Sequence, residues 1–192
     1  MSDQKVIKVG VIGAGRIGKI HAENLATRIP GVVVAAIADV NIEAARELAA
    51  KLHVENVYSD YKKIMGDKSI DAVAICSSTD THADLIIEAA SAGKHVFCEK
   101  PVDHSLAKID KAIDAVKKAG VQCQIGFNRR FDPNFKALRD LVQGGRIGDL
   151  HILRITSRDP APPPAEYVKV SGGMFLDMTI HDFDMARYLS GS

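Results

Sequence analysis

The first two-thirds of the chain alternates short apolar runs with amphipathic stretches of helical length. The apolar runs predict strands at Lys5–Ile12, Val32–Ala38, Ala72–Cys76, His95–Cys98 and Gln122–Phe127. The stretches between them predict helices at Arg16–Arg28, Ile42–Leu52, Ala83–Ala92 and Leu106–Ala119. Regular alternation of strand and helix is typical of a doubly wound parallel sheet. We therefore expect an α/β domain over residues 1–125.

The pattern changes after about Gly126. A short helix is predicted at Phe135–Val142, Asp149–Ser157 alternates like a half-buried strand, and a last helical stretch runs to Tyr188. A strand carries backbone N–H and C=O groups that must be paired, and this part of the sequence offers no obvious second strand. We expect residues 126–192 to be the beginning of an α+β domain whose sheet is mostly absent.

The composition narrows the class of protein. Apolar residues make up 46% and charged residues 26%, which is the balance of a folded globular chain. Lys and Arg number 25 against 24 Asp and Glu, and a net charge of +1 argues against a nucleic-acid or membrane-surface partner. No apolar run approaches the ~18 residues of a membrane span. With no secretory leader pattern at the N-terminus, we expect a cytoplasmic protein that acts on a small molecule.

Three cysteines, Cys76, Cys98 and Cys123, each lie within or at the end of an apolar run. An odd number of cysteines in such positions favours buried free thiols over a disulfide framework or a zinc site. We expect no metal.

A glycine-rich turn joins the first predicted strand to the first helix. Gly13, Gly15 and Gly18 follow the G-x-G-x-x-G pattern, which suits a tight turn, a close approach of pyrophosphate and close helix packing. Asp39 ends the second strand, where a carboxylate binds the adenine-ribose 2′-hydroxyl and repels a 2′-phosphate. A turn that only packs is the alternative, but strand, helix and acid all favour NAD. The expected contacts are Gly13, Gly15, Arg16, Ile17, Gly18 and Asp39.

Two further groups follow strands at the edge where ligands of open α/β sheets bind. Thr79 and His82 come after the third predicted strand and are candidate cofactor contacts, although a helix cap and a surface histidine are equally consistent with them. Glu99-Lys100-Pro101 follows strand His95–Cys98. The proline restricts the backbone of the lysine before it.

Asp177 and His181 are spaced i, i+4 and would project to one side of a helix. Together with Lys100 they form an acid–base set able to move a hydroxyl proton near neutral pH. Taken by themselves, they are also consistent with a helix cap and a hydrogen-bonded histidine.

These motifs together resemble the glucose–fructose oxidoreductase / inositol dehydrogenase / MocA family. The resemblance rests on the glycine turn, on AGKHVFCEKP at Ala92–Pro101 and on Gly173 followed by Asp177 and His181, and it covers essentially the whole chain. Within the family, Gly126–Asp132 and Ser157–Pro160 are most similar to inositol 2-dehydrogenases. The resemblance implies a Rossmann domain, a substrate domain on a large open sheet and a homotetramer. Because family members are longer, it also implies a truncated chain.

The resemblance further implies NAD-dependent oxidation of a secondary hydroxyl of a cyclic polyol, in the first place myo-inositol to 2-keto-inositol. In that reaction His181 takes the hydroxyl proton, Lys100 binds the reacting oxygen and Asp177 orients the polyol. Glu99 and Lys100 become cofactor contacts as well. The implied substrate contacts are Lys100, Asn128, Arg129, Asp159, Asp177 and His181, with Asp184 as a further candidate for a hydroxyl.

Two positions leave the substrate open. Asn128 and Ser157 depart from residues found in some inositol enzymes of the family, so the isomer is not fixed and another sugar remains an alternative. A non-catalytic NAD-binding module is the alternative from another class.

Overall fold

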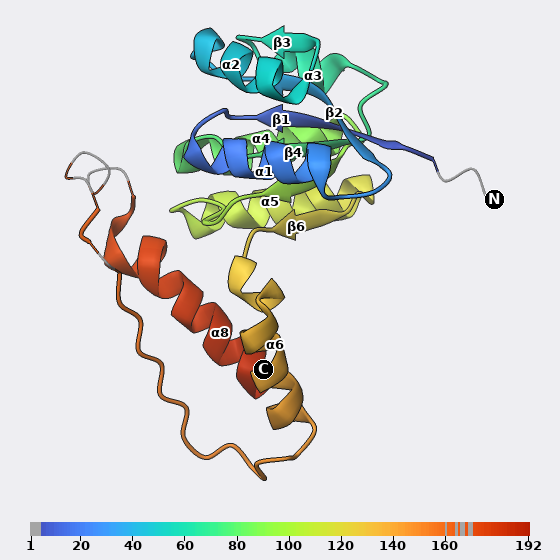
Figure 1. Cartoon of the computed structure of the whole chain (residues 1–192). Coiled ribbons are helices and arrows are strands. Elements are labelled where there is room, and N and C mark those ends of the chain that lie inside the picture. Colours follow the sequence, from blue (N-terminus) through green and yellow to red (C-terminus); the bar gives the residue numbers. More distant parts are fainter. Residues whose placement is uncertain (1–4, 160, 164, 166–167, 169–170) are drawn as a thin grey trace. The chain divides into compact units, whose positions relative to one another are not determined.

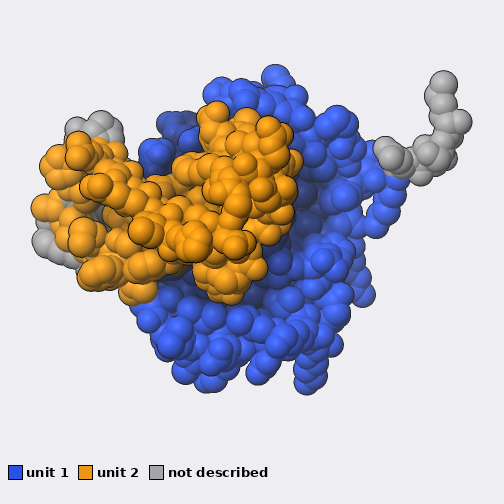
Figure 2. Space-filling view, turned by 90° about the horizontal axis from the view of Figure 1, so that it is seen from below, with its two compact units in different colours: residues 1–125 blue, residues 126–192 orange. Residues whose placement is uncertain are grey.

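The structure is a computed structural model that describes residues 5–159, 161–163, 165, 168 and 171–192 (Figure 1). Pro160, the last residue of the Ser157–Pro160 motif, lies outside the described residues. The chain divides into two compact units, residues 1–125 and residues 126–192, which Figure 2 colours separately.

The first unit is built on a six-stranded parallel sheet in the order β3-β2-β1-β4-β5-β6. Its strands are β1 (Ile7–Ile12), β2 (Val32–Ala38), β3 (Asn56–Tyr58), β4 (Ala72–Ile75), β5 (His95–Cys98) and β6 (Cys123–Ile125). The strand order reverses between β1 and β4, and the carboxyl ends at such a switch point form a crevice for ligands. The predicted doubly wound sheet is confirmed.

Five helices connect these strands: α1 (Arg16–Thr27), α2 (Ile42–Leu52), α3 (Lys62–Gly66), α4 (His82–Ser91) and α5 (Leu106–Ala119). The pattern of apolar residues predicted four of them to within about one residue at each end. It missed β3 and α3, which have three and five residues. Elements this short do not complete enough of a period to stand out in a sequence.

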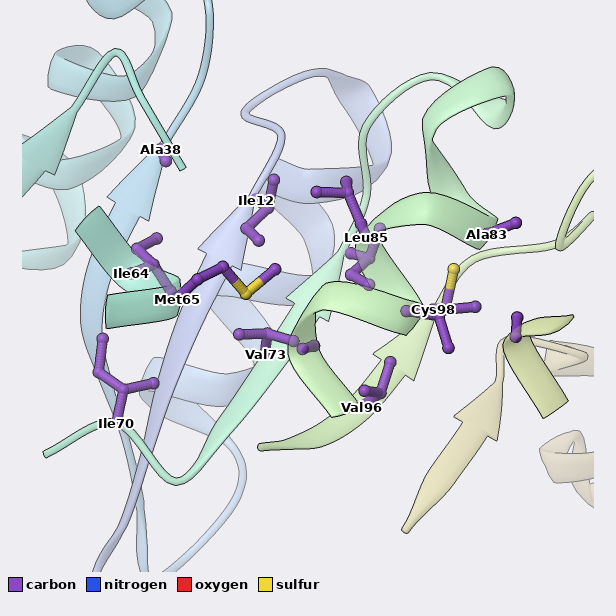
Figure 3. Close-up of a cluster of buried hydrophobic side chains, with 14 of the residues drawn as sticks. Ile12, Ala38, Ile64, Met65, Ile70, Val73, Ala83, Leu85, Val96 and Cys98 are labelled. Carbon is purple, nitrogen blue, oxygen red and sulfur yellow. The ribbon is translucent and has the colours of Figure 1, made fainter. Parts of the chain in front are cut away.

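Two buried clusters cover the two faces of this sheet. Neighbouring residues of one strand alternate between them, as Val11 and Ile12 of β1 do, because successive side chains of a strand point to opposite faces. The first cluster packs against α3, α4 and α5, and Figure 3 shows Ile12, Val73 and Leu85 within it. The second packs against α1 and α2 through Ala22 and Leu48, among others. Burial on both faces explains why these strands are nearly continuous apolar runs.

The second unit contains α6 (Pro133–Gln143) and α8 (Ile180–Ser190), which pack against each other, with two short helical turns, η2 (Asn128–Phe131) and η3 (Phe175–Thr179). The carboxylate of Asp132 caps α6 by accepting hydrogen bonds from the backbone N–H groups of Asn134 at 2.8 Å and Phe135 at 3.3 Å. The Nε2 of Gln143 donates to the Leu189 carbonyl oxygen at 3.1 Å and links the carboxyl ends of α6 and α8.

The predicted strand at Asp149–Ser157 is wrong. Residues 150–159 form no regular structure, and residues 151–159 are exposed. The described part of residues 126–192 contains no strand that could pair with this segment. An alternating pattern alone does not produce a strand, because the backbone groups need a neighbouring strand to bond with.

Candidate functional site

The glycine turn fits the approach of a dinucleotide. Gly13 has a φ of 101°, and a Cβ atom there would lie 2.5 Å from the Cys76 carbonyl oxygen. A Cβ on Gly18 would overlap the Gly13 carbonyl oxygen, so both positions require glycine. Gly15 has no atom within 4 Å of its would-be Cβ, and α1 begins at the next residue. The turn is therefore open where pyrophosphate would meet the free N–H groups of the helix.

A pocket of about 580 Å³ opens beside this turn. Its walls come from the carboxyl ends of β1, β2 and β4 and include Gly15, Asp39 and Ser77. This location is the switch point of the sheet, and the volume suits a small-molecule ligand.

Asp39 lies at the wall of this pocket. Its Oδ2 accepts a hydrogen bond from the Ala14 backbone N–H at 2.6 Å, and its Oδ1 accepts from the Asn41 N–H at 2.8 Å. The carboxylate is thus tied to the glycine turn from the end of the neighbouring strand. A second anion such as a 2′-phosphate would be repelled there.

Thr79 and His82, the candidate cofactor contacts after β4, lie outside the lining of this pocket. Ser77 and Thr81 line it instead, with their hydroxyl oxygens 2.7 Å apart. His82 is only 2% exposed, and its two ring nitrogens face backbone carbonyl oxygens of Ser77 and Pro101. The ring therefore contacts the backbone on both sides, and a cofactor contact of Thr79 or His82 stays a prediction. Ser77 was missed, although it follows β4 much as Asp39 follows β2.

Lys100 sits just beyond the carboxyl end of β5 and is half-buried. The Glu99 backbone N–H donates to the Ile75 carbonyl oxygen at 3.0 Å, which extends the pairing of β5 with β4 up to the lysine. The Glu99 carboxylate lies 2.6 Å from His21 Nε2, and the Lys100–Pro101 peptide bond is cis. The lysine is therefore presented at the ligand edge of the sheet from a defined turn.

The cysteines of the first unit carry no evident chemistry. Burial, with a smaller contribution from Glu99, raises the pKa of the Cys76 thiol to about 12. Burial also raises the pKa of Cys98 far above its ordinary value, and no disulfide forms. Such thiols are poor nucleophiles and poor metal ligands. Among the residues described, no cluster of His, Cys, Asp and Glu could hold a metal ion.

Asp177 and His181 belong to the second unit. Asp177 is 7% exposed within η3, a π-helical turn, and His181 is half-buried near the start of α8. Lys100 belongs to the first unit, so its meeting with this pair stays a prediction. Asn128 and Asp159 are exposed, and their role as substrate contacts also stays a prediction.

Two charged side chains of the second unit have partners within the unit. Arg129 donates from Nη1 to Asp182 Oδ1 at 2.6 Å and from Nη2 to Ser157 Oγ at 3.1 Å. Arg130 forms a bidentate pair with Asp184, with its Nη2 at 2.6 Å and its Nε at 2.9 Å from the carboxylate oxygens. Asp184 is thus paired with Arg130, and its contact with a substrate hydroxyl stays a prediction.

Sheet order, glycine turn and strand-end carboxylate together define a dinucleotide-binding Rossmann domain. Residues 7–127 match the GFO/IDH/MocA oxidoreductase family model, described as an NAD-binding Rossmann fold, and residues 135–192 match the GFO/IDH/MocA C-terminal domain. The chain belongs to the GFO/IDH/MocA oxidoreductase family, and its first unit is the NAD-binding domain.

Known relatives include the myo-inositol 2-dehydrogenase of Thermotoga maritima, which is 57% identical over 96% of this chain and 55% of its own length. The scyllo-inositol 2-dehydrogenase (NAD⁺) of Bacillus subtilis is 42% identical over 97% of this chain and 54% of its own. The structure of scyllo-inositol dehydrogenase from Lactobacillus casei with NAD(H) and scyllo-inositol is 39% identical, with a TM-score of 0.90 over 97% of this chain and 57% of that one.

The chain spans about half the length of the curated relatives that it matches. No helix in the part of the chain described by the structure is long and apolar enough to cross a membrane.

Proposed function

We propose that this chain carries the cofactor domain and the acid–base residues of an NAD-dependent dehydrogenase that oxidises one secondary hydroxyl of an inositol to a ketone. The observation that carries the proposal is the Asp39 carboxylate hydrogen-bonded to the open glycine turn at the switch-point pocket. The names of the relatives support the polyol as substrate class. The myo isomer is the first candidate because the relative at 57% identity is named for it, and scyllo-inositol is the second.

In the proposed mechanism the glycine turn and Asp39 would hold NAD, which would supply the acceptor for the hydride of the reacting carbon. The imidazole of His181 accepts the proton of the reacting hydroxyl, and the Lys100 ammonium donates a hydrogen bond to the same oxygen. The positive charge of Lys100 stabilises negative charge on that oxygen as the proton leaves. Asp177 accepts hydrogen bonds from the polyol and, being buried, holds its orientation with little competition from water.

The test is NADH formation, followed by absorbance, with myo-inositol and scyllo-inositol as separate substrates. It uses the 192-residue chain and the same chain completed to the length of its relatives. Replacing Lys100 by Met, or His181 by Ala, should lower turnover by about 10²–10⁴-fold, because His181 accepts the proton and Lys100 stabilises the negative charge that the proton leaves on the oxygen. NAD binding, measured by calorimetry, should stay within a few-fold of the original value.

The matched control is Lys62→Met, because Lys62 is an exposed lysine of α3. Unchanged turnover in Lys100→Met would contradict the mechanism. NAD binding with no turnover of any polyol by the completed chain would instead favour a non-catalytic NAD-binding module.

The proposal also includes a homotetramer, as the family resemblance implies, and a cytoplasmic location, which the absence of a secretory leader pattern favours. Sedimentation equilibrium of the completed chain tests the tetramer, and cell fractionation tests the location.

A further inference from the structure

The turn that carries Lys100 is held on its amino side by a contact from α1. His21 Nε2 lies 2.6 Å from Glu99 Oε1, with the two side chains 25% and 15% exposed. The His21 ring also packs on Phe97 of β5, with ring centroids 4.7 Å apart. The other oxygen of Glu99 accepts a hydrogen bond from the Lys100 backbone N–H at 3.3 Å. One carboxylate therefore connects α1 to the backbone of Lys100.

The same turn is held on its carboxyl side by α4. His82 Nδ1 lies 2.8 Å from the Pro101 carbonyl oxygen, and its Nε2 lies 3.1 Å from the Ser77 carbonyl oxygen. A neutral imidazole has a single N–H and donates to one of these oxygens at a time. Because Ser77 lines the pocket, this ring connects the Lys100 turn to the pocket wall.

Both contacts bury polar side chains at positions where an apolar side chain would lose less hydration free energy. A buried imidazole and a half-buried carboxylate lose hydration, and their hydrogen bonds return only part of that free energy. The two histidines come from different helices and converge on residues 99 and 101, which flank the lysine. The rate of a reaction that depends on orientation is sensitive to small displacements of the reacting groups, since ~1 Å can cost on the order of 10²-fold in rate.

We propose that His21, acting through Glu99, and His82, acting through the Pro101 carbonyl, are positioning residues that hold the Lys100 amine in register with the cofactor pocket. The proposal deepens the proposed function and rests on Lys100 being the lysine that binds the reacting oxygen. It also gives Glu99 a role through the backbone of Lys100 in place of a direct cofactor contact.

The first experiment compares His21→Leu, Glu99→Gln and the double variant in the completed chain. Each single change should lower kcat by about 10- to 100-fold, with the KM for NAD nearly unchanged. The double variant should lose little more than the single ones, because the two side chains act as one unit. The matched control is His95→Leu at the other end of β5, where an exposed histidine accepts a hydrogen bond from the Gln122 N–H at 3.0 Å.

The second experiment needs no turnover. Trace labelling with acetic anhydride, read by peptide mass spectrometry, compares the reactivity of Lys100 with that of exposed Lys62 in the same sample. Loosening the turn in His21→Leu or His82→Gln should raise the labelling of Lys100 several-fold and leave Lys62 unchanged. His82→Gln keeps one amide donor in case a larger change prevents folding.

The two experiments separate the two proposals. If Lys100→Met retains turnover, the mechanism fails and positioning loses its catalytic role, while selective labelling in His21→Leu would still show that the contact holds the Lys100 amine. If His21→Leu and Glu99→Gln keep the original kcat and Lys100 labelling, positioning is overturned. A loss of kcat that follows a lower melting temperature, with labelling raised at all lysines, would also overturn it, because it would show a general structural role.

Discussion

The two units of the chain differ in what holds them together. The first buries apolar side chains in two clusters on opposite faces of a sheet. Among the described residues of the second, only Met185 and Leu189 are buried hydrophobics, while Phe175 is 65% and Ile152 is 86% exposed. Burial of apolar area is the main favourable term in folding, so most of the stability of the chain lies in the first unit.

Polar contacts join residues of the second unit that are far apart in the sequence. Arg130 pairs with Asp184 and lies 5.3 Å from the centre of the Tyr188 ring, whose hydroxyl donates to the Arg130 carbonyl oxygen. Arg129 joins η2 to Asp182 on α8. Both ion pairs are partly exposed, and ion pairs that keep contact with water contribute about 1 kcal/mol or less each. The comparison teaches that the NAD domain has its own core, whereas the described part of residues 126–192 has only two buried hydrophobic residues and a few polar pairs between residues far apart in the sequence.

The largest effect is expected from a cavity made in the hydrophobic core of the first unit. Replacing Ile75 of β4, which is fully buried, by Ala should lower the free energy of unfolding of the first unit by about 2–5 kcal/mol. Hydrogen exchange followed by mass spectrometry should show protection falling across β1, β4 and β5, and no change in α6 and α8.

Val40→Ala serves as the control, because Val40 is 96% exposed and should change nothing. If α6 and α8 lose protection in step with the sheet in Ile75→Ala, the two units unfold as a single cooperative block and the comparison breaks.

A smaller effect is expected at the cofactor pocket of the first unit. Asp39→Ser removes the carboxylate that would repel a 2′-phosphate, so the ratio of NADP to NAD affinity should rise by about 10- to 100-fold. Binding of each nucleotide by calorimetry measures the ratio, and the matched variant Asp39→Asn removes the charge while keeping an oxygen for Ala14. A preference for NADP in the unaltered chain would refute the role given to Asp39.

The same difference between units explains what could be predicted from the sequence. Five of the six strands of the first unit were predictable because each is a local apolar run, and the glycine turn because Gly13 and Gly18 leave no room for a side chain. The ion pairs of the second unit were not, since Arg130 and Asp184 are 54 residues apart and no local pattern joins them.

The site was predictable only in part for a related reason. Gly15, Asp39 and Lys100 lie within three residues of a strand end, and a strand end has a defined place in a parallel sheet. The buried ring of His82 could not be placed from the sequence. Its position depends on the turn at Pro101, which comes 19 residues later.

The smallest predicted effect concerns Asp71, whose carboxylate forms hydrogen bonds at the amino end of β1. Asp71 accepts hydrogen bonds from Lys5 Nζ at 2.6 Å and from the Lys8 backbone N–H at 2.9 Å. These bonds, with that of Lys5 the larger, lower the pKa of the Asp71 carboxyl below its ordinary value. A carboxyl with a lower pKa in the folded state stabilises the fold above its unfolded pKa, and this contribution disappears as the pH falls through the folded pKa.

Asp71→Asn should therefore lower the free energy of unfolding of the first unit at neutral pH by about 0.5–1.5 kcal/mol. It should also flatten the loss of stability at pH values below about 4, because the variant has no carboxyl to protonate. Urea unfolding at a series of pH values measures both effects, with Asp114→Asn on the exposed face of α5 as the control. An equal loss of unfolding free energy at pH 7 and pH 3 would show that the charge of Asp71 does not contribute to stability. A matching loss of stability in α6 and α8 would show that polar contacts of the first unit also support the second.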